Sequence, residues 1–332
     1  MRTTTMQDIA RAAGVSLATV GRVLHGGYVS AEKREKIEKA IADLNYIPNR
    51  SASNLKRSDS LTIGHLMRYN PNGLHAQINR HLTESARQRG YDVASATIYT
   101  DSGLEQAREL VSQRVDGIII SCGSMMREDE ILSLTDMGVP LVMVERWVDL
   151  PKVDRVVNND LLGARTAVER MIAAGRRHIG YVGPRFTASI ERDRHQGWKD
   201  ALEQAGLPEG PSVLTEDFMA DMGRAAAERI LDSGAACDGI FCASDILAAG
   251  VMQALYAAGL RVPDDVLMTG YDNTIAELLS PRIASVALDY ETVCERAMDL
   301  LLRRISDPDL PAQEAVVDPV YTDHQEGSFH HE

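Results

Sequence analysis

From residue 61 onward, short apolar runs alternate with longer segments in which apolar residues recur every three or four positions. The runs predict buried strands, and the recurring pattern predicts amphipathic helices. Because strands that are apolar on both faces need helices on both sides, the alternation predicts parallel sheets of α/β type. The predicted strands span 61–67, 91–99, 115–121, 139–145, 178–183, 238–243 and 264–271. The predicted helices span 76–89, 103–114, 161–174, 195–205, 222–232, 246–258 and 290–304.

The first 46 residues follow a different pattern, with three short helical segments and no strand. The first helix is predicted to end at Gly14, and Ser16 is placed to cap the second. Ala10 is small enough for two helices to cross closely. A third helix follows, with Ser30 placed to cap it and one apolar face formed by Ile37, Ile41 and Leu44. This arrangement predicts a helix-turn-helix, whose second helix enters the major groove of DNA, and the alternative is a plain helical hairpin.

Charge is divided unevenly along the chain. The 332 residues carry a formal net charge of −13, which by itself argues against a nucleic-acid partner. Residues 1–57, however, hold 10 Lys and Arg against 5 Asp and Glu, a net charge of +5 that leaves −18 for the remainder. A basic module joined to an acidic body is the pattern expected when only one end of the chain binds DNA.

The segments DIARAAGVSLATVGRVLHG and LNYIPN resemble the N-terminus of the lactose-repressor (LacI/GalR) family of transcription regulators. The resemblance implies a helix-turn-helix domain over 1–46, a hinge helix and linker over 47–60, and a two-lobed core of periplasmic-binding-protein type over 61–332. The fold class is thus α plus α/β. In the core, the resemblance implies a lobe 1 of about 61–158 and 288–322, a lobe 2 of about 159–280, and a crossover near 281–287.

The resemblance also implies how the chain meets DNA. Leu17, Ala18 and Arg22 are expected to face base edges, and Leu55 to wedge into the minor groove from a hinge helix that forms on DNA. Gly21 stands where the family usually has Ser, which removes a phosphate contact, and Ser53 stands where a hinge Arg is common. The expected DNA-contacting residues are Thr5, Ser16, Leu17, Ala18, Thr19, Arg22, His25, Tyr28, Asn49, Ser51, Ala52, Leu55 and Lys56.

Ligands of open α/β sheets bind at the carboxyl ends of the strands, so polar residues there are candidates for an effector site. The resemblance places Arg194 at the inducer-binding Arg, Phe218 at an aromatic wall and Asp272 at a ligand-binding acid. An Arg opposite an Asp suits a neutral polyhydroxylated ligand, which favours a mono- or disaccharide. For His75 and Asn158, ligand contact and packing remain open alternatives. The expected effector-contacting residues are Leu74, His75, Ser121, Arg146, Asn158, Arg194, Phe218, Ser244 and Asp272.

These observations predict a cytoplasmic, homodimeric repressor that leaves a palindromic double-stranded operator when a carbohydrate effector binds. The alternatives are an effector that acts as corepressor, a nucleobase-like effector, and a sugar-processing enzyme. The enzyme is disfavoured because no GxGxxG, GxxxxGK[ST], GxSxG or HExxH motif appears. A secreted sugar-binding protein would need a signal segment, which the N-terminus does not resemble. We expect no cofactor, metal or membrane contact, and the last residues lack the heptads of a tetramer.

Overall fold

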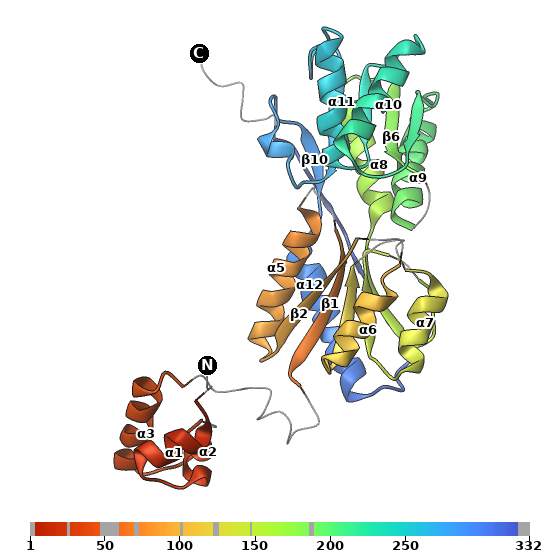
Figure 1. Cartoon of the computed structure of the whole chain (residues 1–332). Coiled ribbons are helices and arrows are strands. Elements are labelled where there is room, and N and C mark those ends of the chain that lie inside the picture. The colour runs from red at the N-terminus through yellow and green to blue at the C-terminus, as the bar shows by residue number, and fades with distance from the viewer. Residues whose placement is uncertain are drawn as a thin grey trace. The chain divides into compact units, whose positions relative to one another are not determined.

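The computed structural model describes residues 4–24, 27–46, 60–69, 73–99, 102–121, 126–146, 148–185 and 189–324. The chain forms two compact units, Met1–Ser60 and Leu61–Glu332, and each is described by itself (Figure 1). The smaller unit is helical. The larger unit contains two sheets and the helices that cover them.

The N-terminal unit packs three helices, α1 (Met6–Ala13), α2 (Leu17–Leu24) and α3 (Ala31–Asp43), around a small core. Ile9, Val20 and Ile37, one from each helix, are fully buried. Thr5 caps α1 in a capping box with Asp8. The turn between α1 and α2 passes through Gly14 at a φ of 65°, the left-handed conformation that glycine adopts without steric cost.

The ends of α2 and α3 differ in how they are held. Ser16 Oγ accepts a hydrogen bond from the Thr19 amide at 3.3 Å, so it caps α2 as predicted. Ser30 makes no side-chain cap, and this prediction was wrong. The segment before α3 is fixed instead by Arg34, whose guanidinium donates to the Gly27 carbonyl at 3.2 Å. Leu44 is also not part of the buried face: it ends α3 and is 38% exposed.

Gly21 lies in the middle of α2 with room for a larger residue. A Cβ at this position would meet only the Met6 side chain, at an ordinary contact distance of 3.8 Å. We therefore expect Gly21→Ala to stabilise α2 by about 0.5–1 kcal/mol through helix propensity. Amide hydrogen exchange of α2 in the full chain checks this, because the variant should slow exchange there. Exchange that is unchanged or faster would contradict the expectation.

The core contains two six-stranded sheets. In lobe 1 the strand order is β11-β5-β4-β3-β1-β2, and in lobe 2 it is β12-β10-β9-β8-β6-β7. All pairings are parallel except that of β10 with β12. The lobe 1 strands are β1 (Thr62–Arg68), β2 (Asp92–Ile98), β3 (Gly117–Ser121), β4 (Leu141–Val144), β5 (Val153–Asn158) and β11 (Glu314–Val317). The lobe 2 strands are β6 (Ile179–Pro184), β7 (Ser212–Thr215), β8 (Gly239–Cys242), β9 (Leu267–Asp272), β10 (Ala284–Ala287) and β12 (Val320–Thr322).

Helices cover both sheets, as continuous apolar strands require (Figure 1). Lobe 1 is covered by α5 (Leu74–Gln88), α6 (Leu104–Ser112), α7 (Glu128–Asp136) and α12 (Tyr290–Ser306). Lobe 2 is covered by α8 (Asp160–Ala173), α9 (Ser189–Gln204), α10 (Ala220–Asp232) and α11 (Asp245–Ala257), followed by the short helix η2 (Ala276–Leu278). No helix in the described ranges is long and apolar enough to cross a membrane.

The chain passes between the lobes three times. It leaves lobe 1 between β5 and α8 and returns between β10 and α12, after residue 287. The crossover expected at 281–287 is therefore wrong, because residues 284–287 pair with β9 as a strand of lobe 2. The C-terminal segment expected wholly in lobe 1 also changes lobes, since β12 pairs with β10. Pro319 separates β11 from β12 and has no N–H with which to continue a ladder.

Candidate functional site

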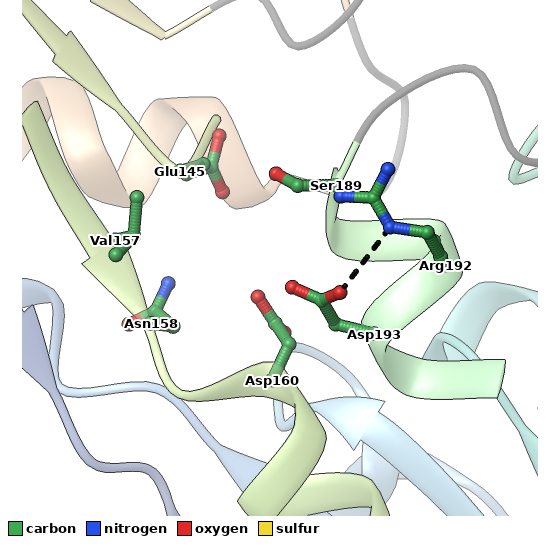
Figure 2. Close-up of a pocket in the computed structure, with 7 residues that line it drawn as sticks. All are labelled: Glu145, Val157, Asn158, Asp160, Ser189, Arg192 and Asp193. Carbon is green, nitrogen blue, oxygen red and sulfur yellow. Dashed lines mark ion pairs between the residues drawn. The ribbon is translucent and has the colours of Figure 1, made fainter. Parts of the chain in front are cut away.

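A cavity of about 310 Å³ lies where the two lobes meet. Lobe 1 contributes residues at the carboxyl ends of β4 and β5, and lobe 2 contributes the first residues of α8 and α9. Figure 2 shows the polar lining side chains arranged around one open space, with Arg192 and Asp193 ion-paired at one side. The lining residues are Glu145, Val157, Asn158, Asp160, Ser189, Arg192 and Asp193.

Arg194 lies behind the cavity wall and holds Asp160 in place. Its Nε donates to Asp160 Oδ1 at 2.8 Å, and its Nη1 donates to the Ala243 carbonyl at 2.8 Å. The guanidinium also lies 3.9 Å from the centre of the Tyr271 ring. Burial opposes the charge of Arg194, but the neighbouring Asp160 raises the pKa of the guanidinium above its ordinary value. Arg194 is thus a buried, fully engaged cation.

Glu145 is a buried carboxyl of the cavity wall. It follows β4 at a φ of 72° and is 7% exposed. Burial raises the pKa of its carboxyl to about 7, although the Arg194 guanidinium opposes the shift. Its Oε2 lies 3.9 Å from His75 Nδ1, but burial lowers the pKa of that imidazole to about 3, aided by His65 and Arg68. His75 is therefore neutral near pH 7, and the contact is not an ion pair there.

Asn158 lines the cavity with a side-chain amide that is only partly satisfied. The residue ends β5, is 8% exposed, and its Oδ1 has no hydrogen-bond partner among the described residues. His75 Nδ1 is likewise buried without a hydrogen-bond partner in the described ranges. Buried polar atoms are nearly always paired, so orphaned atoms beside a cavity are what a site for a hydrogen-bonding ligand presents. A ligand hydroxyl could donate to Asn158 Oδ1.

Other candidate effector residues are engaged within one lobe. Ser121 Oγ is hydrogen-bonded to His65 Nε2 at 2.7 Å, and Ser244 caps α11 by accepting from the Leu247 amide at 3.3 Å. Asp272 Oδ1 accepts from the Thr274 hydroxyl at 2.6 Å, and Arg146 Nη1 donates to the Met126 carbonyl at 2.5 Å. Leu74 and Phe218 pack against the apolar core. Of the nine candidates, Asn158 lines the cavity and Arg194 supports it from behind.

The sequence patterns did not predict several of the lining residues. Glu145 follows a predicted strand, but nothing in the sequence shows that it is buried. Asp160 is held at the cavity by a hydrogen bond from Arg194, which lies 34 residues later in the sequence. Ser189, Arg192 and Asp193 fell before the predicted helix start at 195, whereas α9 begins at Ser189. The signal that could have found them is the acid-rich segment IERDR, which continues the helical pattern toward the N-terminus.

The N-terminal unit exposes one face of α2. Leu17 is 45% exposed, Ala18 and Arg22 are exposed beside it, and Tyr28 is 91% exposed. Thr5 is exposed but also caps α1, and Ser16 Oγ lies 2.8 Å from Thr19 Oγ1. Arg22 Nε donates to the Ala18 carbonyl at 3.5 Å, and the side chain is exposed. An exposed apolar side chain beside an exposed guanidinium fits the predicted contacts with base edges. The predicted contacts His25, Asn49, Ser51, Ala52, Leu55 and Lys56 lie outside the described residues.

Comparison with known proteins places this architecture in one family. Residues 5–49 match the model for bacterial regulatory proteins of the lacI family, and residues 168–323 match a periplasmic binding protein-like domain. The chain is 32% identical over 321 residues to the ribose operon repressor of Haemophilus influenzae, which covers 95% of this chain and 96% of that protein.

Solved structures of LacI-family regulators are similar to this chain. The lac repressor dimer bound to operator and an anti-inducer has a TM-score of 0.82 and 26% identity, and covers 97% of this chain and 98% of that one. The transcriptional regulator CelR in its cellobiose complex has a TM-score of 0.72 and 29% identity, and covers 96% of this chain and 98% of that one. The chain therefore belongs to the LacI family of bacterial regulatory proteins, whose members compared above include DNA-binding repressors.

Proposed function

We propose that this protein is a transcriptional repressor that leaves its operator when a neutral monosaccharide binds the cavity between the lobes. The observation that carries the sugar assignment is the orphaned Asn158 Oδ1 beside the buried Glu145 carboxyl. Both are acceptors, and a polyol offers several adjacent hydroxyl donors. A volume of about 310 Å³ is at the small end of ligand sites, which favours one sugar ring over two.

The charges around the cavity favour an unphosphorylated ligand. Three carboxyls line it, from Glu145, Asp160 and Asp193, against the single lining guanidinium of Arg192. Arg194 does not alter this balance, because it is already paired with Asp160. A phosphate ester would bring negative charge toward these carboxyls, so a neutral polyol fits better. Ribose is the first probe to use, since the relative from H. influenzae is named a ribose operon repressor.

The proposed action is binding rather than catalysis. Ligand-induced movement of one lobe against the other would change the geometry of a dimer and so the spacing of its two DNA-reading units. Because linkage is reciprocal, a sugar that weakens operator binding must itself bind less tightly to the operator complex.

The test measures operator affinity with and without sugar. A binding site is first selected from random DNA duplexes with the full chain, and affinity is then followed by fluorescence anisotropy. Ribose is expected to weaken binding, whereas ribose 5-phosphate at the same concentration should not. Tighter binding with ribose would instead show a corepressor. If no palindromic site is selected, the repressor proposal fails.

Asn158→Leu tests the sugar site directly. Removing one hydrogen bond to the ligand is expected to weaken ribose binding by about tenfold, measured by isothermal titration calorimetry. The same change removes a buried unsatisfied oxygen, so the ligand-free variant should be as stable as the wild type or more so. Opposite signs for affinity and stability separate a ligand contact from general damage. Unchanged ribose affinity would exclude Asn158 from the site.

A further inference from the structure

An ion pair bridges the two lobes away from their covalent connections. Arg68, the last residue of β1 in lobe 1, is paired through Nη2 with the carboxylate of Asp217, which follows β7 in lobe 2. Their side chains are 26% and 31% exposed. The strands next to the crossovers lie toward one edge of each sheet. They are β5 and β11 in lobe 1 and β10 and β12 in lobe 2. Arg68 and Asp217 come from strands toward the opposite edges, β1 and β7.

We propose that Arg68 and Asp217 form a latch that holds the lobes closed and that anchors the segment carrying Phe218 through Asp217. A protein whose two lobes are joined covalently at one side opens about that side. A contact at the other side therefore has the largest effect on the equilibrium between the open and closed forms. The influence of the latch on effector affinity rests on the proposed function, but its influence on closure does not.

Both ends of the latch are held rigidly by their surroundings. Asp217 Oδ1 accepts from the Phe218 amide at 2.7 Å, and the Asp217 carbonyl accepts from the Thr215 hydroxyl at 2.9 Å. On the other side, the Tyr69 amide donates to the Ile98 carbonyl at 3.0 Å, and the Tyr69 ring stacks on Tyr99 with centroids 5.4 Å apart. A pair with fixed, half-buried ends loses less side-chain entropy than a loose surface pair, so its attraction is better preserved.

The latch also connects to the site. The Asp217 carboxylate that meets Arg68 also accepts from the Phe218 amide, so the latch is attached to the segment that carries the candidate aromatic wall. On the lobe 1 side, Arg68 is close enough to His75 to contribute to the lowered pKa of that imidazole. Arg68 and Asp217 are thus positioning residues.

A pair of similar exposure within one lobe provides a matched control. Arg89 of α5 donates through Nη2 to Asp299 of α12 at 2.7 Å, with side chains 24% and 50% exposed. Both helices belong to lobe 1, so breaking this pair leaves the interlobe contact intact. Reversing the charge at Arg89 tests whether effects at Arg68 arise from the latch or from charge alone.

The experiment compares the wild type with Arg68→Asp, Asp217→Arg, the double swap Arg68→Asp/Asp217→Arg, and Arg89→Asp. In the full chain without ligand, hydrogen exchange of residues 216–219 should be faster in Arg68→Asp than in the wild type. Asp217→Arg and the swap also lose the acceptor of the Phe218 amide, so in these two variants ribose affinity alone reports on the latch. Ribose affinity, from calorimetry, should fall by about tenfold in the single variants and recover to within about threefold in the swap. Arg89→Asp should change neither readout.

Each outcome decides a stated point. If the swap does not recover ribose affinity, or if Arg89→Asp accelerates exchange of residues 216–219 as much as Arg68→Asp does, the latch is wrong. If the wild type does not bind ribose, the proposed function loses its probe, while exchange in the ligand-free chain still tests the latch. Arg68→Gln provides a milder variant should charge reversal prevent folding, and it should speed exchange in the same segment.

Discussion

Replacing Arg194 by methionine is expected to lower the free energy of unfolding by about 3–5 kcal/mol. The side chain is 4% exposed, and its loss would leave Asp160, itself 2% exposed, as a buried carboxylate without its cation. The Ala243 carbonyl would lose a donor as well. Urea denaturation of the full chain at pH 7, followed through the far-ultraviolet circular dichroism of the core, measures the loss.

Two further variants test whether the unpaired Asp160 carboxylate causes this loss of stability. Arg194→Met/Asp160→Leu replaces both charges by apolar groups and should recover most of the lost stability, since the cost comes from the unpaired carboxylate. Arg224→Met removes a cation from an exposed pair with Glu228 and should change stability by less than about 0.5 kcal/mol. A loss below about 1 kcal/mol in the single Arg194 variant would show that Asp160 is not dependent on Arg194. The expectation that Arg194 contacts an inducer stays a prediction beside this structural role.

Glu145→Gln is expected to stabilise the protein at alkaline pH. The folded-state pKa of this carboxyl is about 7, raised from an ordinary 4.5, so the fold favours its protonated form. As pH rises above 4.5 the unfolded chain ionises first, and the native state loses stability until about pH 7. A shift of this size corresponds to at most about 3 kcal/mol, which the neutral glutamine would not lose.

The measurement is urea denaturation of both proteins at pH 4.5, 6 and 8. The two should be equally stable at pH 4.5, and the variant should lead by about 2–3 kcal/mol at pH 8. Burial lowers the pKa values of His65 and His75, which affects stability below pH 6.5 in both proteins and cancels in the difference. Gln204→Ala, at the exposed last position of α9, changes no titratable group and should give a difference that does not vary with pH. A flat profile for Glu145→Gln would contradict the buried-carboxyl assignment.

The fold was predictable where a strand is determined by the residues within it. The seven strands read as apolar runs are all present, within a few residues of their expected ends. β5 was missed because Asp154 and Arg155 interrupt its apolar run. Asp154 is tolerated in a buried strand because Arg304, 150 residues later, pairs with it at 2.8 Å. A pattern of neighbouring residues does not show such a distant partner.

The sequence predicted a site between the two lobes, but it did not predict most of the residues that line it. Asn158 was identified from the family resemblance and not from a predicted strand, because β5 was not predicted. Glu145 and Asp160 were missed because their importance lies in burial and in contacts with distant residues, namely His75 and Arg194. Ser244 and Asp272 occupy family positions, yet both side chains make local hydrogen bonds that a motif does not reveal.

The three crossovers have a consequence for how the protein is made. Lobe 1 obtains α12 and β11 from residues 290–317, after nearly all of lobe 2 has been synthesised. Until those residues leave the ribosome, the faces of β3, β4 and β5 that α12 covers remain open to water. Lobe 2 is in turn incomplete without β12 at residues 320–322. Neither lobe can finish folding on a nascent chain before the other, so loss of the last thirty or so residues would leave both exposed to proteolysis and aggregation.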